Sequence, residues 1–514
     1  MKFIAYDLGT GGVKASLHDE ALQPLGTAFL EYPTYYPAAE AHQQRPEDWW
    51  DAVCAATRAL LSDTETRAEE IACAALSGHS LVAVPVGADG RALLDLVPIW
   101  SDTTAAAEAE EFFTRVDPED WYLTTGNGFP APCYTLFKLM RLARTEPEIF
   151  GKTARVLGSK DYINFRLTGG AATGSTTTGA MAAGGIATDP SYASGSGAYS
   201  LRSGRFEPRF LEAAGLPAGI FPEIVPSHTV VGKVTAEAAA ASGLAAGTPI
   251  ACGGVDNACM ALGAVGPDEG KVYLSLGSSS WIPVNSSEPV LDYSKKPYVF
   301  AHIAEGMFTS AFSIFSGGSS RKWVRENILC GGGFDEFDRI ADAVAPGSGG
   351  IHFNPSLAGG TSQDKSPAIR GAYVGLHLGT TRDELLRAAM EGITLNLKLS
   401  YDFMRERARL DDSLLICGGG SQSRVWLQMF ADVFGVEVYK TNIDQNAASL
   451  GAAAIAARAV GHWPDYSGIA ALHEREAAYA PRPEYTEIYR ELLPRFALAA
   501  DALADLGDAL KRME

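Results

Sequence analysis

The sequence has little of what a secreted, metal-scaffolded or membrane-spanning protein needs. It contains no apolar run of about 18 residues, the length that a helix needs to cross a bilayer. Its seven cysteines are scattered and odd in number, and they form no Cys-x-x-Cys pair, which argues against a disulfide framework or a zinc site. The N-terminus has one lysine and then an apolar run with an aspartate, which leaves no room for a signal segment. We expect a soluble, cytoplasmic protein.

Positive charge is also scarce. Lysine and arginine total 42 against 61 aspartates and glutamates, so the formal net charge is −19. A chain of this charge has no electrostatic basis for binding the phosphate backbone of a nucleic acid or an anionic membrane surface. We expect neither kind of partner.

Two common nucleotide-binding signatures are missing. No G-x-G-x-x-G follows a strand-like run, and no G-x-x-x-x-G-K-[ST] occurs. The dinucleotide fingerprint and the Walker loop therefore lack support. Any nucleotide site in this chain must be built in another way.

The chain is long enough for more than one domain. With 514 residues and 46% hydrophobic content, it predicts two to three domains with sizeable cores. Strand-like and helix-like segments alternate in both halves, which indicates an α/β protein. An alanine-rich segment ends in glycines near residue 247, and we place the boundary there, giving domains 1–246 and 247–514. The small-residue segment 168–204 is interpreted as loop.

The two halves share a local pattern. Residues 3–19, "FIAYDLGTGGVKASLHD", form two apolar runs joined by glycines, which predicts a hairpin. Residues 271–284, "KVYLSLGSSSWIPV", repeat this pattern weakly in the second half. Amphipathic helices are expected at 45–65, 135–147, 381–410 and 423–435.

Three turns rich in glycine and serine are candidates for binding phosphate or nucleotide. Successive backbone N–H groups in such a turn can surround phosphate oxygens, because no bulky side chain holds the backbone away. The candidates are "DLGTGG", "SLGSSS" and "CGGGSQSR", the last of which leads into a helix. Each turn alone is equally compatible with a tight connection that binds nothing.

Two aspartates each end an apolar run beside glycines. They are Asp7 in "IAYDLG" and Asp256 in "ACGGVDNA". A carboxylate in such surroundings is costly unless it is paired, hydrogen-bonded or near a metal. One can hold the magnesium ion of a nucleotide, and the other can accept a proton from an attacking hydroxyl. The alternative for each is a turn or helix-cap aspartate.

Several segments in order resemble the FGGY family of carbohydrate kinases, and most its xylulokinase branch. They are "DLGTGGVKA", "RPEDWW", "IWSD", "GSKDYINFRLTG", "GGVDNACMALGAV", "LSLGSSS", "LLICGGGSQSRVWLQMFADVFG" and "SLGAAAIAA". The similarity runs from Met1 to about residue 490. It implies two ribonuclease-H-like domains of the actin/hexokinase ATPase type, which close over ATP and a sugar in an interdomain cleft.

The resemblance also implies roles for individual residues. Asp7 matches a position at the Mg–ATP phosphates and Asp256 matches the catalytic base, with Asn257 as a sugar contact. The matches to ATP-binding positions are Gly9, Thr10, Gly11, Lys14, Gly277, Ser278, Gly419 and Ser423. The implied cofactors are ATP and Mg²⁺, the implied acceptor is a small sugar, and members of this family often form homodimers.

The sugar-side segments depart from the family pattern. Where relatives usually have "GQMHG", this chain has "SGHSLV", which places His79 and Ser80 there as substrate-binding candidates. "IWSDTT" keeps Trp100 and Asp102, but the usual arginine is Thr104. An expected carboxylate or amide is replaced at Thr177, and "GGTSQDKSP" replaces a "GERTP"-like loop. ATP use is therefore expected to be retained, while the acceptor stays open.

The sequence thus predicts an ATP-dependent sugar kinase with Asp256 as general base and xylulose as the default acceptor. A kinase for another ketose, polyol or sugar acid is the alternative within this class. Two further alternatives are an ATP-binding regulator or scaffold without turnover and an actin-like filament or chaperone ATPase. A sugar-dependent release of ADP would separate the kinase from both.

Overall fold

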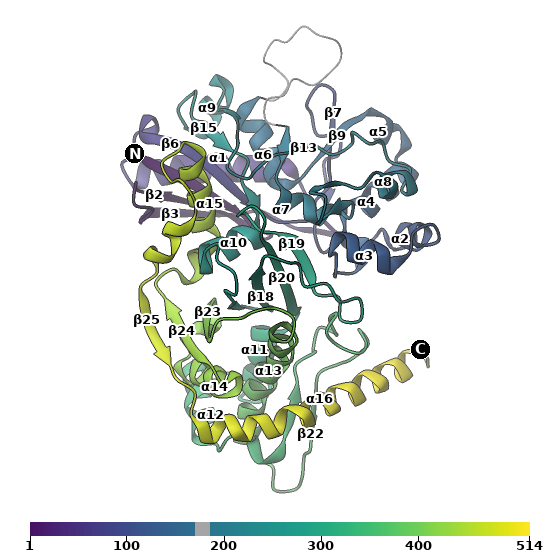
Figure 1. Ribbon diagram of the computed structural model, residues 1–514, viewed down its shortest axis with the longest axis vertical. Coiled ribbons are helices and arrows are strands. Elements are labelled where there is room, and N and C mark those ends of the chain that lie inside the picture. Colours follow the sequence, from purple (N-terminus) through teal and green to yellow (C-terminus); the bar gives the residue numbers. More distant parts are fainter. Residues whose placement is uncertain (170–185, 514) are drawn as a thin grey trace. The chain divides into compact units, whose positions relative to one another are not determined.

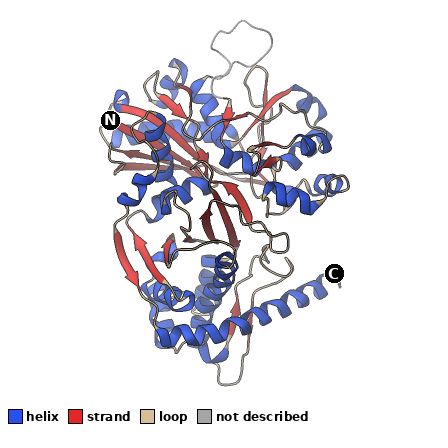
Figure 2. Ribbon diagram, viewed as in Figure 1, coloured by secondary structure: helices blue, strands red, loops and turns tan. Residues whose placement is uncertain are grey.

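The computed structural model describes residues 1–169 and 186–513. It divides into two compact units that are not contiguous in sequence. Unit 1 comprises Met1–Pro267, Val299–Thr309 and Asn446–Leu472, and unit 2 comprises Asp268–Tyr298, Ser310–Gln445 and His473–Glu514. Both combine a sheet with packed helices (Figures 1 and 2). The predicted α/β class is confirmed.

The sheet of unit 1 begins with the predicted hairpin. Strand β1 (Lys2–Leu8) pairs antiparallel with β2 (Gly12–His18), which pairs with β3 (Pro24–Glu31). On its other side β1 pairs in parallel with β6 (Ile71–Gly78). The order of the sheet is β14-β15-β6-β1-β2-β3, where β14 is Val230–Lys233 and β15 is Pro249–Ala251. The short strand β16 (Gly254–Val255) also pairs in parallel with β6.

Helices of unit 1 cover this sheet with apolar faces. Helix α1 (Pro46–Asp63) packs along β2 and β3, and it buries an apolar face that includes Trp49, Trp50 and Val53. Helix α10 (Asp256–Val265) lies against α15 (Ala447–Ala459), which packs along β1 and β6. The two helices approach so closely that a Cβ at Gly263 would lie 1.8 Å from the Ala447 carbonyl oxygen. This packing joins segment 446–472 to unit 1.

The segment expected to be loop, 168–204, is only partly so. Thr177 and the other residues 170–185 lie outside the described part of the chain. Beyond them the chain forms β10 (Ala187–Thr188), α7 (Pro190–Ala193) and β11 (Tyr199–Ser200), most of whose residues are buried. Asp189 is the N-cap of α7, and its carboxylate accepts hydrogen bonds from the backbone N–H groups of Ser191 and Tyr192.

The sheet of unit 2 repeats the plan of unit 1. Strand β17 (Tyr273–Leu276) pairs antiparallel with β18 (Ser280–Ser286) and in parallel with β23 (Ser413–Cys417). The order continues from β20 (Phe308–Ile314) through β18, β17 and β23 to β24 (Glu437–Thr441) and β25 (Arg475–Tyr479). The predicted echo of the opening hairpin is confirmed.

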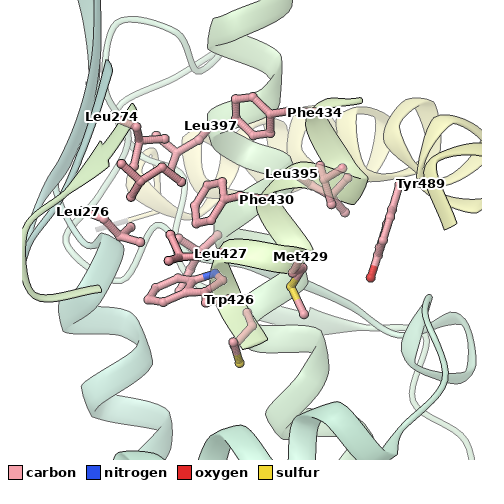
Figure 3. Close-up of a cluster of buried hydrophobic side chains, with 14 of the residues drawn as sticks. Leu274, Leu276, Leu395, Leu397, Trp426, Leu427, Met429, Phe430, Phe434 and Tyr489 are labelled. Atoms are coloured by element: carbon pink, nitrogen blue, oxygen red, sulfur yellow. The ribbon is translucent and has the colours of Figure 1, made fainter. Parts of the chain in front are cut away.

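The core of unit 2 lies between this sheet and its helices. The main helices are α11 (Gly317–Asn327), α12 (Phe334–Ala343), α13 (Arg382–Arg405), α14 (Arg424–Phe434) and α16 (Pro483–Lys511). Leu274 and Leu276 of β17 face the α14 side chains Leu427 and Phe430 in one buried cluster (Figure 3). Within the described ranges no helix combines the length and apolar character that a membrane span requires.

The remaining elements complete the two units. In unit 1 they are β4 (Tyr35–Ala38), β5 (Ala41–Gln44), β7 (Val84–Gly87), β8 (Val97–Pro98), α2 (Ala106–Phe113), α3 (Pro118–Thr125), α4 (Thr135–Thr145), α5 (Pro147–Lys152), β9 (Thr153–Leu157), α6 (Ser159–Thr168), β12 (Arg205–Phe206), α8 (Pro208–Ala213), β13 (Glu223–Ile224) and α9 (Ala236–Ser242). Strand β19 (Tyr298–Ala301) pairs with β20 at the edge of the seven-stranded sheet that holds β17, and β21 (His352–Asn354) pairs with β22 (Ala372–Val374) in a separate two-stranded sheet.

Candidate active site

The two aspartates singled out in the sequence lie at the carboxyl ends of β1 and β16, two strands of unit 1 that both pair in parallel with β6. Asp7 on β1 is in register with Ser77 on β6, and Ser77 is in register with Gly254 on β16. Asp256 follows two residues after Gly254. Because carboxyl ends of parallel strands meet at one edge of a sheet, both carboxylates belong to the same edge. The charge of Asp7 also acts on Asp256 and raises its pKa.

Asp256 is the first residue of α10, directly after its N-cap Val255. Its Oδ1 accepts a hydrogen bond from the backbone N–H of Asn257 at 2.8 Å. Burial raises the pKa of Asp256 to about 7, and the nearby charge of Asp7 adds to this rise, while the Asn257 N–H opposes it. A carboxyl group with such a pKa can accept and release a proton near neutral pH.

Asp7 is set in a more polar environment. Its Oδ1 accepts a hydrogen bond from Ser77 Oγ at 3.1 Å, and Lys14 is its cross-strand neighbour on β2. Burial raises the pKa of Asp7, whereas Lys14 and the Ser77 hydroxyl lower it. Lys14 Nζ also donates to Asn446 Oδ1 at 3.4 Å. The β1–β2 turn therefore carries one carboxylate and one ammonium group side by side.

The turn between β1 and β2 is held by three side chains. Tyr32 donates its hydroxyl hydrogen to the Gly9 carbonyl oxygen. Gln44 Nε2 donates to the Thr10 carbonyl oxygen at 2.6 Å, and Trp100 Nε1 donates to Thr10 Oγ1 at 2.9 Å. These bonds fix the turn before any ligand arrives, which lowers the entropy cost of binding.

The glycines of this turn have different surroundings. A Cβ at Gly12 would lie 2.4 Å from the Leu30 carbonyl oxygen, so β3 itself requires glycine there. A Cβ at Gly11 would meet no atom within 4 Å. The packing of the protein thus leaves space at Gly11, as the approach of a phosphate group would require.

His79 lies at the same edge, directly after β6. It is 1% exposed, and its Nδ1 lies 3.1 Å from the Leu8 carbonyl oxygen. Burial lowers the pKa of His79 to about 4, so its imidazole is neutral at pH 7. A carbonyl only accepts, so Nδ1 carries the hydrogen and Nε2 is an acceptor. Among the described residues this buried Nε2 has no hydrogen-bond partner.

The other sugar-side candidates differ in how free they are to bind a ligand. Trp100 is 36% exposed, and Ser80 is partly buried directly after His79. Asp102 is fully buried, and its oxygens accept from the His42 N–H at 2.9 Å, the Thr104 N–H at 3.1 Å and Thr104 Oγ1 at 2.6 Å. Asp102 thus braces the loop that carries Trp100.

The second turn, at Gly277 and Ser278, lies in unit 2. The first N–H groups of helix α11 brace it: Gly318 N–H donates to the Gly277 oxygen at 2.8 Å and Ser319 N–H to the Ser278 oxygen at 3.0 Å. A Cβ at Gly318 would lie 2.4 Å from the Gly277 oxygen. Glycine at 318 permits this close contact between helix and turn.

The third turn follows β23, the parallel neighbour of β17, so it lies beside the second turn. Gly418 has φ +93°, and a Cβ at Gly420 would lie 2.4 Å from the Leu276 side chain. A Cβ at Gly419 would meet nothing within 4 Å. Ser423 caps helix α14 by accepting a hydrogen bond from the Trp426 N–H.

An aspartate that the sequence analysis did not single out holds this third turn. Asp444 accepts hydrogen bonds from the Gly418 N–H at 2.7 Å, Ser421 Oγ at 3.2 Å and Gln422 Nε2 at 3.0 Å. Its own φ is +37°, in the left-handed region. The local sequence "TNIDQN" resembles an ordinary polar turn, so only the fold reveals this role. Gln44, which holds the first turn, is a second example.

The structure therefore places the predicted residues in two groups. Unit 1 holds both aspartates, the first turn with Lys14, Asn257 and the sugar-side candidates, and unit 2 holds the second and third turns. Asp256 and Asn257 follow residue 247 but belong to unit 1. In the described part of the chain no three His, Cys, Asp or Glu side chains are grouped as a metal cage.

Comparison with known proteins gives consistent matches over the whole chain. The N-terminal domain of the FGGY family of carbohydrate kinases matches residues 2–263, and the C-terminal domain of that family matches residues 272–460. A xylulose kinase of Bacillus subtilis (strain 168) is 29% identical over 513 residues, covering 99% of each chain. A gluconokinase of Bacillus licheniformis is 24% identical over 515 residues, covering 97% of this chain and 96% of the relative.

Solved structures agree with the sequence matches. The crystal structure of a xylulose kinase from Rhodospirillum rubrum superimposes with a TM-score of 0.87 at 26% identity, covering 99% of this chain and 100% of that chain. With the paired sheets and braced turns described above, these matches show that the chain belongs to the FGGY family of carbohydrate kinases and has their two-domain fold of the actin/hexokinase ATPase type.

Proposed function

We propose that this protein transfers the γ-phosphoryl group of ATP to a hydroxyl of a sugar, with D-xylulose as the first acceptor. The observation that carries the proposal is the pair Asp7 and Asp256 at one edge of the unit 1 sheet, with the pKa of Asp256 raised to about 7. The product from D-xylulose would be D-xylulose 5-phosphate, together with ADP.

In the proposed reaction Asp256 acts as general base. The acceptor oxygen forms a bond to the γ-phosphorus while the bond from that phosphorus to the β,γ-bridging oxygen breaks. The hydroxyl proton passes to the Asp256 carboxylate, and ADP leaves. The Asn257 N–H holds Asp256 Oδ1 at 2.8 Å, which limits the rotation of the carboxylate. Positioning and charge neutralisation carry most of the rate enhancement in such transfers.

The braced turns are assigned to the nucleotide. Gly9, Thr10, Gly11 and Lys14 form the proposed first phosphate loop, and Gly277 and Ser278 the second. Gly419 and Ser423 are proposed to contact the adenosine. The support is geometric: both Gly11 and Gly419 leave open space where a Cβ would otherwise project.

A magnesium ion fits the residues at Asp7. Mg²⁺ in phosphotransferases is usually held by one or two carboxylates together with phosphate oxygens and water, not by an all-protein cage. Asp7 offers such a carboxylate at the end of β1, beside the first turn. When bound with ATP, the ion would neutralise phosphate charge, and we assign Asp7 as the residue that orients it.

The acceptor is proposed to contact His79, Ser80, Trp100 and Asp256, with Asn257 and Asp102 nearby in the same unit. The buried Nε2 of His79 is suited to accept a hydrogen bond from a sugar hydroxyl. Xylulose is preferred because of the xylulose kinase relative, which spans 99% of the chain. Gluconate is the second candidate because a gluconokinase matches nearly as much of the chain.

The test is the release of ADP from Mg–ATP with a panel of acceptors: D-xylulose, D-ribulose, gluconate, glycerol and glucose. The sugar-free rate is subtracted, and ³¹P NMR identifies the phosphorylated carbon. We expect one acceptor to stand out and Asp256→Asn to abolish its turnover while nucleotide affinity stays within a few-fold. A flat panel with intact nucleotide binding would contradict the proposal and favour a regulator without turnover.

A further inference from the structure

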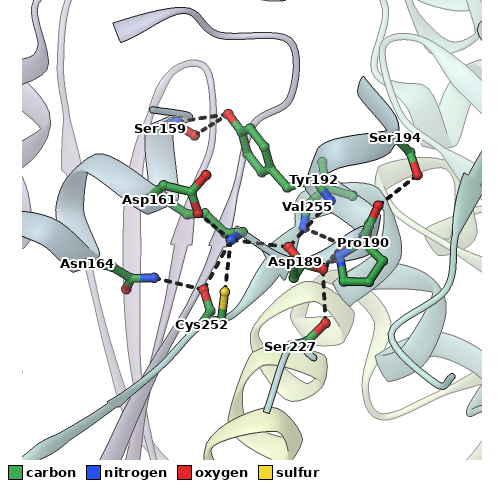
Figure 4. A network of polar contacts seen from close by, with 12 residues as sticks. Ser159, Asp161, Asn164, Asp189, Pro190, Tyr192, Ser194, Ser227, Cys252 and Val255 are labelled. Carbon is green, nitrogen blue, oxygen red and sulfur yellow. Dashed lines mark hydrogen bonds and ion pairs between the residues drawn. The ribbon is translucent and has the colours of Figure 1, made fainter. Parts of the chain in front are cut away.

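A buried network of charged and hydroxyl groups reaches Cys252 and Val255, in the segment directly before Asp256 (Figure 4). At its centre is Lys160 on α6, which is fully buried. Its Nζ lies 2.6 Å from Asp161 Oδ1 and 3.2 Å from Asp189 Oδ1. The two carboxylates keep the lysine charged, and its pKa is raised well above the ordinary value.

Asp189 connects this lysine to two serines. Its Oδ2 accepts hydrogen bonds from Ser191 Oγ at 2.5 Å and from Ser227 Oγ at 2.9 Å. Ser191 lies two residues after Asp189, in the helix α7 that Asp189 caps, whereas Ser227 comes from the loop before β14. One carboxylate therefore fixes three separate parts of the chain.

The same network holds segment 252–255, which directly precedes Asp256. Ser191 Oγ accepts the Val255 N–H at 3.0 Å, and the Cys252 carbonyl oxygen accepts from Lys160 Nζ at 3.2 Å. The Gly253 N–H donates to the Ser227 carbonyl oxygen at 3.0 Å. The three residues whose side chains contact Asp189 are Lys160, Ser191 and Ser227, and each of them is also hydrogen-bonded to segment 252–255.

Segment 252–255 is tightly packed against β6. Gly253 has φ +79°, and a Cβ there would lie 2.1 Å from the Leu76 carbonyl oxygen of β6. Val255, the N-cap of α10, is the residue that sets where this helix begins. The Val255 N–H bond to Ser191 therefore holds the backbone of the residue directly before Asp256.

A buried ion pair contributes little to the net free energy of folding. Its desolvation penalty often cancels its attraction, so well-packed apolar residues would serve as well. What the pair supplies here is a fixed geometry, because three segments converge on one carboxylate. A displacement of about 1 Å at a reacting group can reduce a rate by about a hundredfold.

We propose that Lys160, Asp189 and Ser191 are positioning residues that aim Asp256 at the acceptor hydroxyl. None of them touches the reacting atoms in the mechanism above, and each acts through segment 252–255. This inference rests on the proposed function, because it presupposes that Asp256 takes the proton.

The test compares Ser191→Ala with the matched variant Ser242→Ala. Ser242 is also a fully buried serine of unit 1, whose Oγ donates to the Ala238 oxygen at 2.7 Å and accepts the Leu244 N–H at 3.2 Å. Both variants lose one hydroxyl that accepts a backbone N–H, but Ser242 has no bond to segment 252–255. We expect Ser191→Ala to lower kcat about 10- to 100-fold, with the KM values for Mg–ATP and acceptor within about threefold.

A merely structural role would lower the thermal midpoint of both variants to a similar extent and leave kcat per folded molecule unchanged. That result, or a change confined to KM, would overturn the inference. If Ser191→Ala does not fold, Ser227→Ala provides the same test. This substitution removes the hydroxyl that donates to Asp189, and it keeps the Ser227 carbonyl oxygen that accepts from the Gly253 N–H. A kcat equal to that of Ser242→Ala would then overturn the inference.

Wild type and Asp256→Asn are assayed first. A wild type without acceptor-dependent ADP release, or an active Asp256→Asn, would overturn the proposed function and with it the inference. An active wild type, an inactive Asp256→Asn and a Ser191→Ala with normal kcat would overturn the inference alone.

Discussion

At the scale of single residues, two aspartates of unit 1 have different roles because their surroundings differ. Asp102 accepts three hydrogen bonds and holds a loop, whereas Asp256 accepts one N–H and has its pKa raised to about 7. A carboxylate with few donors and a raised pKa is the one suited to take up a proton. This difference separates the candidate base Asp256 from Asp102, the buried aspartate of the sugar-side segments.

The raised pKa of Asp256 predicts how activity depends on pH. A general base must be deprotonated, so kcat/KM should rise about tenfold per pH unit below pH 7 and level off above it. The measurement is kcat/KM from pH 5 to 9 at saturating magnesium, in buffers of constant ionic strength. A profile that is flat across pH 6–8 would remove Asp256 as the base that limits the rate.

The same shift predicts a cost in stability at high pH. The pKa of Asp256 is above its ordinary value of 3.8, so the folded state binds the proton more tightly and loses stability as pH rises from about 4 to 7. Asparagine mimics the neutral carboxyl. Asp256→Asn should therefore have a higher thermal midpoint than wild type at pH 8, and the gain should vanish near pH 4. An equal gain at both pH values would show another cause.

The proposed role of Asp7 predicts how the rate depends on the concentration of Mg²⁺. In Asp7→Asn the amide oxygen can still accept the hydrogen bond from Ser77 Oγ, but the negative charge of the carboxylate is lost. We expect the Mg²⁺ concentration that gives half-maximal rate to rise at least tenfold, together with a lower kcat. Titrating Mg²⁺ at fixed ATP in wild type and variant measures this. An unchanged magnesium curve would contradict the role of Asp7 as the ion's partner.

At the scale of elements, the main strands and helices of both sheets followed from local patterns. The opening hairpin, α1, α4, α13 and α14 appear where periodicity and turn residues predicted them. The short elements β10, of two residues, and α7, of four residues, did not, because β10 depends on its pairing with the distant strand β13 and α7 is only a single turn capped by Asp189.

The candidate site was predictable only where it has a motif. Asp7, Asp256 and the three turns stand beside glycines, which local sequence displays. Asp444, Gln44 and Lys160 serve the site through partners far away in sequence. Nothing near them in the chain indicates those partners, so their roles emerge only from the fold.

The third turn offers a test at this scale. Asp444→Ala removes the acceptor for Gly418, Ser421 and Gln422, so the turn should lose its order and the KM for ATP should rise about tenfold. Asp444→Asn keeps one oxygen and suits the positive φ of +37°, so its effect should be smaller. Steady-state kinetics at saturating acceptor compares them. Equal, normal KM values would show that this aspartate does not order the nucleotide turn.

At the scale of the whole molecule, each unit is assembled from separate pieces of the chain. Segment 446–472 returns to unit 1 through the close packing of α15 on α10, and segment 473–514 completes unit 2 with α16. The turns assigned to ATP are divided between the units, since the first belongs to unit 1 and the other two to unit 2. The proposed nucleotide contacts therefore come from segments that lie far apart in the sequence.

This division predicts which amides a nucleotide protects. A non-hydrolysable ATP analogue with Mg²⁺ at about 100 times its Kd should stabilise the folded chain by about 2.7 kcal/mol. Hydrogen exchange with and without it should show slower exchange at residues 8–14, 276–280 and 418–423. In Asp444→Ala the protection at 418–423 should fall at equal analogue concentration. Protection confined to 8–14 would remove Gly277, Ser278, Gly419 and Ser423 from the nucleotide site, because a bound nucleotide slows exchange where it holds backbone N–H groups closed.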